Sequence, residues 1–172
     1  MSFAIRQLTD LSEDDVEQLA EVLVDCVAGG ASVSFMHPLP LATARAFWRG
    51  LAADLGGGRR ALLVAADAGG IFGTVQVVLG QPENQTHRAD IAKMLVHRRG
   101  RRRGVGAQLM QAAEDVARRA GKTLLVLDTF TGDAGERLYQ RLGWQFVGTI
   151  PDYALHPHGG LGSTSLYYRR LA

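Results

Sequence analysis

Residues 97–106 read HRRGRRRGVG. Five arginines lie between Arg98 and Arg103, interrupted only by Gly100, and two further glycines follow at Gly104 and Gly106. A run of this kind fits three interpretations: a nucleic-acid-binding patch, a targeting signal, or a loop that holds a phosphate group. The segments on either side of the run distinguish between them.

The arginine run lies between a predicted strand and a predicted helix. Residues 89–96 form a short, mainly apolar run, and apolar residues recur at helical spacing over 105–120. The first N–H groups of a helix have no partner within it, and the helix dipole favours an anion there. Glycines let the backbone approach a ligand, and arginines fork onto phosphate oxygens. This context favours a phosphate or pyrophosphate site.

Two other glycine-rich phosphate loops do not fit the run. A P-loop needs a Gly-Lys-Ser/Thr sequence, which does not follow here. A dinucleotide-binding fingerprint needs a third glycine, and Leu109 holds its place, so the match is poor.

The composition is that of one globular domain, which we expect to span residues 1–172. Apolar residues make up 47% of the chain, and the formal net charge is only +2. Without the five arginines of the run, 14 basic residues would face 17 acidic ones, so the positive charge is local. A protein that coats nucleic acid spreads its charge over a face, and we therefore expect no nucleic-acid partner.

The N-terminal residues MSFAIRQLTD lack the pattern of a secretion signal, and no apolar run approaches the ~20 residues needed to span a bilayer. We therefore expect a cytoplasmic protein with no membrane association. Cys26, the only cysteine, lies among apolar residues at helical spacing and is predicted to be a buried thiol. His156 and His158 have no further ligand at a convincing spacing, so we predict no metal site.

The periodicity predicts one chain of helices and strands without repeats or linkers. The crossover from the strand at 89–96 to the strand at 123–127 implies two parallel strands in a mainly antiparallel sheet. The expected helices are 12–28, 41–55, 105–120 and 133–142, and the expected strands are 61–66, 71–79, 89–96, 123–127 (ending in Asp128), 144–150 and 165–169.

The spacing Arg101-x-x-Gly104-x-Gly106 resembles the pyrophosphate loop of the GCN5-related N-acetyltransferases (GNAT). The preceding Met94-Leu95-Val96, the strand ending in Asp128 and the segment 136–144 resemble that family too. The resemblance implies an α/β fold of the α+β type. It has a mixed, mainly antiparallel seven-stranded sheet, splayed between strands 4 and 5 and flanked by about four helices. It also implies an acyltransferase that uses acetyl-CoA.

A narrower likeness extends over nearly the whole chain. Residues 29–36, 93–96, 127–129 and 164–168 resemble a branch of the family that acetylates the amino group of a β-lactam amino-acid toxin. This implies a small-molecule amine as acceptor, such as a toxic amino-acid analogue or an antibiotic. The alternative is an enzyme that acetylates protein N-termini or lysines. Dimers are common in the family, so a homodimer is an open possibility.

Acetyl transfer by direct attack of an amine on a thioester needs a base, because a free alkyl amine with a pKa of roughly 10 is protonated at neutral pH. The resemblance implies Asp128 and Asp90 as candidate bases and Tyr139 as the general acid near the coenzyme sulfur. Relatives have glutamate in place of Asp90, so the shorter side chain suits binding of the amine or action through water. The alternatives are an ion pair at a strand end for each carboxylate and simple packing for Tyr139.

The resemblance also implies the residues that hold the coenzyme. Backbone groups of Leu95 and Val96 would pair with the pantetheine arm, and the Val96 N–H would stabilise the oxyanion. The pyrophosphate would be held by Arg101, Arg102, Arg103, Gly104, Val105, Gly106 and Ala107. No role in the motif falls to Arg98 or Arg99, which would meet the 3′-phosphate or only solvent.

The apolar loop 31–35 is expected to form the floor of the acceptor site, with Ser32, Ser34 and Phe35 as the substrate-binding residues. The alternative is a connector between two helices that packs its own apolar side chains.

Overall fold

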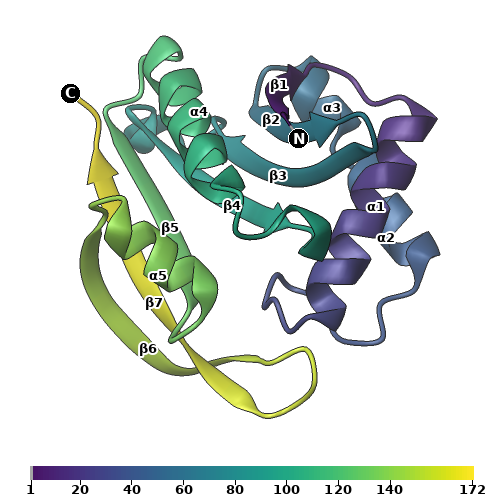
Figure 1. Ribbon diagram of the computed structural model, residues 1–172. Coiled ribbons are helices and arrows are strands. Elements are labelled where there is room, and N and C mark those ends of the chain that lie inside the picture. The colour runs from purple at the N-terminus through teal and green to yellow at the C-terminus, as the bar shows by residue number, and fades with distance from the viewer. Residues whose placement is uncertain (1) are drawn as a thin grey trace.

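The computed structural model describes residues 2–172 and contains one seven-stranded sheet in the order β1-β2-β3-β4-β5-β7-β6 (Figure 1). All neighbouring strands are antiparallel except β4 and β5, which confirms the predicted mixed sheet. The strands are β1 (Ala4–Leu8), β2 (Arg60–Asp67), β3 (Gly70–Val78), β4 (Arg88–Val96), β5 (Leu124–Phe130), β6 (Gln145–Leu155) and β7 (Leu161–Arg170).

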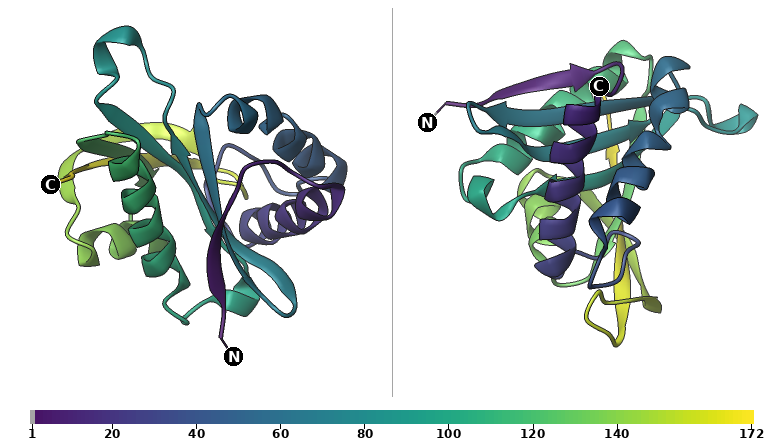
Figure 2. Two further views of the ribbon diagram at one scale, coloured as in Figure 1. Left: turned by 90° about the horizontal axis from the view of Figure 1, so that it is seen from above. Right: turned by 90° about the vertical axis from the view of Figure 1, so that its right-hand side faces the viewer.

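Helices cover both faces of the sheet, which divides the apolar interior into two cores (Figure 2). One face carries α1 (Glu13–Ala28), α2 (Leu41–Arg49) and α3 (Ala52–Gly56), and the other carries α4 (Val105–Arg119) and α5 (Ala134–Arg141). Short 3-10 helices lie at η1 (Glu83–Gln85) and η2 (Arg98–Gly100). Alternate residues of the central strands therefore enter different cores.

Local sequence signals account for the long helices. The Ser12 side chain accepts the Asp15 N–H, and the Asp15 carboxylate accepts the Ser12 N–H, so a reciprocal capping box begins α1. At α5, Asp133 accepts the N–H groups of Gly135 and Glu136. The spacing Asp133-x-x-Glu136 is that of a capping box, but the Glu136 carboxylate accepts the N–H of Gly132 rather than that of Asp133.

The structure corrects the predicted elements at several points, and the last two strands are longer than the predicted 144–150 and 165–169. The predicted helix 41–55 is two helices, because the chain breaks at Gly50, a residue that disfavours a helix interior. The pattern of residues did not predict β1, which is an edge strand with only Leu8 buried and so lacks apolar alternation. β5 continues to Phe130, so Asp128 lies within the strand and not at its end.

The sheet opens between β4 and β5. Only Arg88–Asp90 pair with β5, opposite Leu124–Val126, and the two strands diverge beyond that point. On its other edge β4 carries a bulge, where Lys93 adopts a positive φ of 49° and the register against β3 shifts. The predicted splay between strands 4 and 5 is confirmed, and it exposes backbone groups in the middle of the sheet.

Candidate active site

The loop between β4 and α4 forms an anion-binding helix terminus. Arg102 and Gly104 both have positive φ values, 61° and 74°, and Gly104 faces open space. No side chain caps α4, so its first N–H groups are available to a ligand. The N-terminus of α4 thus has no side-chain cap, and the space beside Gly104 is open. This arrangement fits the pyrophosphate of a coenzyme.

The two arginines without a motif role, Arg98 and Arg99, are bound by carboxylates elsewhere in the chain. The Asp25 carboxylate on α1 accepts the backbone N–H of Arg98 at 2.9 Å and pairs with its guanidinium. Arg99 pairs with Asp67 at 2.9 Å and also donates to the Gly70 carbonyl at 2.8 Å. Both side chains remain exposed to solvent while they make these contacts.

Arg103 also turns toward the protein. Its guanidinium lies 3.3 Å from the Asp67 carboxylate and stacks over the rings of Phe3 and Phe72. The carboxylates of Asp67 and Asp25 are each only 8% exposed, whereas the Arg98 side chain is 66% exposed. Together these pairs fasten the loop to α1 and to the β2–β3 turn.

Four arginines of the loop are exposed: Arg98, Arg99, Arg101 and Arg102. Of these, Arg101 and Arg102 form no ion pair with a carboxylate among residues 2–172. Arg101 donates to the Val96 carbonyl at 3.2 Å, and its guanidinium lies against Gly29 at the end of α1. Gly106 and Ala107 form the first turn of α4. A Cβ atom on Gly106 would stand 2.9 Å from Leu138 of α5, so glycine permits the close approach of the two helices.

The last residues of β4 lie along the opening in the sheet. Leu95 and Val96 pair with Thr74 and Gly73 of β3 on one side, whereas no pairing with β5 continues past Asp90 in the described residues. Leu95 is buried in the core beneath α1. The edge of β4 toward β5 can therefore accept an extended ligand in the manner of an added strand.

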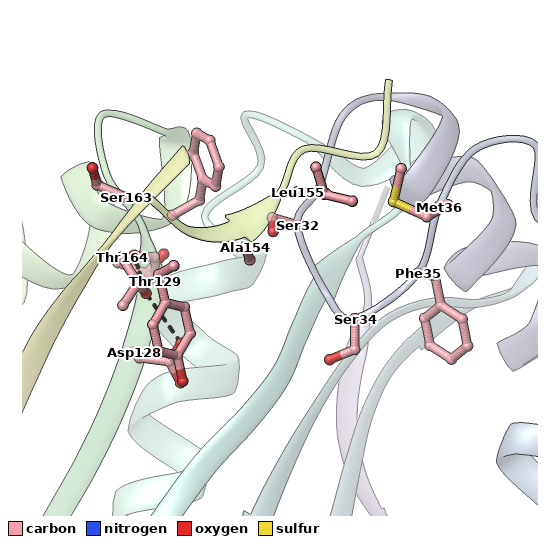
Figure 3. Close-up of a pocket in the computed structure, with 12 residues that line it drawn as sticks. Ser32, Ser34, Phe35, Met36, Asp128, Thr129, Ala154, Leu155, Ser163 and Thr164 are labelled. Carbon is pink, nitrogen blue, oxygen red and sulfur yellow. Dashed lines mark hydrogen bonds between the residues drawn. The ribbon is translucent and has the colours of Figure 1, made fainter. Parts of the chain in front are cut away.

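A cavity of about 280 Å³ lies beside the end of this opening, between the loop 31–36 and strands β5 and β7 (Figure 3). It brings together Ser32, Ser34 and Phe35 from the loop and Asp128 from β5. The His37 N–H donates to the Pro157 carbonyl at 2.9 Å, which joins the loop to the β6–β7 hairpin. The other residues that line the cavity are Met36, Thr129, Phe130, Tyr153, Ala154, Leu155, Ser163 and Thr164.

Asp128 is exposed to this cavity and is held by one neighbour. The Thr164 hydroxyl lies 3.1 Å from Oδ2 of Asp128 and 3.0 Å from the Thr129 carbonyl (Figure 3). The other carboxylate oxygen has no hydrogen-bond partner among residues 2–172. The carboxylate is thus oriented and still free to accept a proton.

Tyr139 lies on the opposite face of the sheet, on α5, and is only 6% exposed. Burial, followed by the negative charges of Asp133 and Asp128, raises the pKa of its hydroxyl well above the usual value. The hydroxyl bonds no group among residues 2–172, yet it is not among the fully enclosed polar atoms. It is therefore a protonated group that solvent or a ligand can reach.

Asp90 is not part of the cavity lining. Its carboxylate pairs with Arg88 and accepts the Gln81 amide at 3.0 Å, on the same face of the sheet as Asp128. This matches the alternative of an ion pair at a strand end.

The sequence assigned no role to several polar residues at the cavity, among them Thr129, Ser163, Thr164 and the nearby Lys93. Thr164 lies in a segment that carried the family resemblance but was given no role. Lys93 bonds Ser34 at 3.3 Å, and only the bulge in β4 brings it there. Among residues 2–172 no group of three or more metal-binding side chains is gathered, and no helix has the length and apolar character to cross a membrane.

A splayed mixed sheet with an anion-binding helix terminus and an adjacent carboxylate cavity defines the class of the protein as an acyltransferase. Residues 20–144 match the family model of the acetyltransferase (GNAT) family, and the chain belongs to this family. Its cofactor is acetyl-CoA, as the predicted resemblance implied.

Solved structures share the fold over the whole chain. A GCN5-related N-acetyltransferase from Kribbella flavida is 26% identical with a TM-score of 0.79, covering 98% of both chains. An N-acetyltransferase from Staphylococcus aureus Mu50 is 16% identical with a TM-score of 0.81, covering 100% of both chains. A protein from Salmonella typhimurium, described as an acetyltransferase and solved with its cofactor acetyl-CoA, is 19% identical with a TM-score of 0.79, covering 100% of this chain and 95% of its own.

Proposed function

We propose that the enzyme acetylates the amino group of a small molecule. The observation that carries this proposal is the size of the cavity at Asp128, about 280 Å³, which suits an acceptor with the bulk of an amino acid. The loop 31–36 and the β6–β7 hairpin enclose it from two sides, and the bond between His37 and Pro157 joins those two walls.

The long likeness to the tabtoxin resistance protein favours a toxic amino-acid or β-lactam analogue, such as a tabtoxinine-like compound, or an antibiotic as acceptor. The segments that carry this likeness include the loop residues 29–36 and the Asp128 strand, both of which line the cavity. Resistance to such a compound is the cellular role that follows from this acceptor. A cytoplasmic location stays a prediction from the sequence.

Asp128 is the proposed base for the acceptor. Its free carboxylate oxygen would bind the ammonium group and take its proton, while Thr164 holds the other oxygen in place. Asp90, which is engaged by Arg88, would act on the amine only through its charge or through water. Tyr139 would hold a proton at its hydroxyl for the departing group, because burial keeps its pKa high.

Acetyl-CoA supplies the acetyl group as an activated thioester, which the neutral amine would attack directly. The backbone of Leu95 and Val96 would pair with the pantetheine arm, and the Val96 N–H would donate to the oxyanion. Arg103 would contribute its N–H group alone, since its guanidinium is engaged by Asp67. The pyrophosphate would lie on the backbone and side chains of Arg101, Arg102, Gly104, Val105, Gly106 and Ala107.

The test is release of free thiol from acetyl-CoA with amino acids, tabtoxinine-type lactams and polyamines, beside peptides and whole proteins. We expect turnover with a small amine. Asp128→Asn should lower kcat about 100-fold or more, in line with the loss of a general base, and leave acetyl-CoA binding intact. Asp115→Asn on the outer face of α4 serves as the control. Acetylation of proteins or peptides alone, with no small amine accepted, would contradict the proposal.

One observation favours a protein or peptide acceptor instead. Met36, Tyr153 and Leu155 line the cavity while remaining 45%, 56% and 53% exposed, so its rim is apolar and accessible. A peptide could lie across this rim with its terminal amine at Asp128. The same panel of acceptors separates the two functions.

We also propose that the chain forms a homodimer. β6 lies at the open edge of the sheet and exposes apolar side chains on both of its faces. The unpaired backbone groups of such an edge strand can pair with those of a second copy.

A further inference from the structure

Lys93 takes no part in the proposed chemistry, yet its position is unusual. It lies on the bulge of β4 with a φ of 49°, and the residue it contacts, Ser34, has a φ of 76°. A positive φ is strained for lysine and for serine, and such strain gathers at functional sites. The two strained residues contact each other at the wall of the acceptor cavity that Ser34 forms.

The surroundings of Lys93 lack a counter-ion. Its ammonium lies 3.3 Å from the Ser34 hydroxyl and 5.7 Å from the centroid of the Phe47 ring. No carboxylate among residues 2–172 forms an ion pair with it within 4.0 Å. A half-buried cation with two unused N–H donors and no anionic partner is suited to bind an anion from a ligand.

The charges around Lys93 define two opposite ends of the acceptor site. Burial lowers the pKa of Lys93; the negative charge of Asp128 works against this effect, and the positive charge of Arg60 adds to it. Ser34, on which Lys93 rests, and Asp128 line opposite sides of the same cavity (Figure 3). A ligand in the cavity meets the Asp128 carboxylate at one end and, at the other, the Ser34 hydroxyl, with the Lys93 ammonium 3.3 Å from that hydroxyl.

We propose that Lys93, together with Ser34, binds a carboxylate of the acceptor and thereby selects amines that carry an acid group. The inference rests on the proposed function and names its substrate class: an amino acid or amino-acid analogue whose ammonium faces Asp128 and whose carboxylate faces Lys93. Lys93 is a specificity-determining residue, and it needs no proton transfer for this role. Amines without an acid group leave its charge unpaired in the bound state.

The test compares acceptors that differ only in the acid group. Amino acids are each assayed beside their α-amides, and the best pair is used with Lys93→Met, which keeps length without charge, and Lys93→Arg, which keeps charge. We expect the wild type to prefer the acid over the amide by at least about 30-fold in kcat/KM, on the scale of a lost charged hydrogen bond. Lys93→Met should lose that preference through KM, and Lys93→Arg should restore part of it.

Lys122→Met is the matched control, because Lys122 binds the carbonyls of Leu79 and Thr86 away from the cavity. The melting temperature and the dissociation constant of acetyl-CoA are measured for each variant, so that loss of folding is separated from loss of selectivity. Equal use of acid and amide by the wild type, or a preference that survives Lys93→Met, would overturn the inference while leaving small-amine acetylation intact. Turnover of proteins or peptides alone would overturn both proposals.

Discussion

At the scale of single residues, burial sets the protonation of the groups in and around the site. Burial raises the pKa of the Tyr139 hydroxyl and the Cys26 thiol and lowers that of the Lys93 ammonium. In each case burial favours the neutral form over the charged one. The burial of Cys26 followed from its apolar neighbours in the sequence and is confirmed. The position of Lys93 could not be predicted from the sequence, because it depends on a bulge in β4 that no local sequence pattern indicates.

Replacing Tyr139 by phenylalanine tests its chemical role with little structural change. Its hydroxyl bonds no group among residues 2–172, so we expect the melting temperature to stay within a few degrees. If the hydroxyl is the proton donor, kcat falls roughly 100-fold while KM for acetyl-CoA is kept. Steady-state kinetics and thermal unfolding measure both quantities.

Tyr167→Phe is the matched control. The Tyr167 hydroxyl donates to Glu136 at 2.9 Å and accepts from Gln140 at 3.0 Å. This variant should lose about 1–3 kcal/mol of stability because the buried Glu136 carboxylate loses one of its donors and keeps the Gly132 N–H. An unchanged kcat in Tyr139→Phe would remove Tyr139 from the mechanism.

The Cys26 thiol should react slowly in the native enzyme. Burial raises its pKa to about 11 from 9.0, which lowers the fraction of reactive thiolate about 100-fold at neutral pH. Titration with a thiol reagent at pH 8 should therefore show slow labelling that becomes fast in denaturant. Fast labelling of the folded enzyme, with Cys26→Ala as the unreactive control, would contradict this assignment.

At the scale of elements, the sequence predicted those whose signals are local. The start of α1 and the adjacent strands β2 and β3 are confirmed, as are the strand, loop and helix around the arginine run. The partners of Arg98 and Arg99 could not be predicted, because Asp25 and Asp67 lie 73 and 32 residues away in the chain. The acceptor cavity likewise depends on contacts between distant segments.

Asp67 should link the coenzyme loop to the rest of the fold, since it binds both Arg99 and Arg103. Asp67→Asn is expected to weaken acetyl-CoA binding several-fold by loosening the loop, with kcat less affected. Equilibrium binding of acetyl-CoA checks this, and Asp115→Asn, which removes an exposed pair with Arg118, should leave binding unchanged. Equal affinity in the two variants would contradict the role of Asp67.

The same variant should change the dependence of stability on pH. The hydrogen bond from Arg99 holds the pKa of Asp67 below its usual value, so the folded state binds this proton less tightly than the unfolded state. The stabilisation is therefore fully present above about pH 4 and is lost as the pH falls through the lowered folded pKa. Denaturant unfolding should show a gap between wild type and Asp67→Asn that is constant at neutral pH and closes in acid.

At the scale of the whole molecule, the sheet is two halves joined at a narrow contact. β4 and β5 pair over Arg88–Asp90 and separate beyond that point, although the core under α4 and α5 takes residues from both halves. A ligand in the opening replaces the missing strand contacts, so the coenzyme should join the halves as well as supply the acetyl group.

Acetyl-CoA should therefore stabilise the fold strongly. Binding to the folded state alone adds about 2.7 kcal/mol at a ligand concentration of 100 Kd. Thermal unfolding with and without acetyl-CoA measures this, and Gly104→Val is the informative variant, because a branched side chain is strained at a φ of 74° next to the helix terminus. The shift in melting temperature should shrink in Gly104→Val and persist in Gly56→Ala, where a Cβ meets open space.

The free edge at β6 should decide the oligomeric state. β6 pairs with β7 on one side only, and Phe146, Val147 and Tyr153 are 56%, 62% and 56% exposed along it. Two copies that pair along this edge would satisfy its open backbone groups and cover its apolar side chains, and a twofold axis allows the same edge to serve both copies.

We expect light scattering after size exclusion to give twice the chain mass at micromolar concentration. Val147→Lys should shift the enzyme to monomers by placing like charges opposite each other, whereas Ala42→Lys, on the exposed face of α2 across the molecule (Figure 1), should not. A wild-type enzyme that elutes as a monomer at 100-fold higher concentration would show that β6 ends the sheet unpaired.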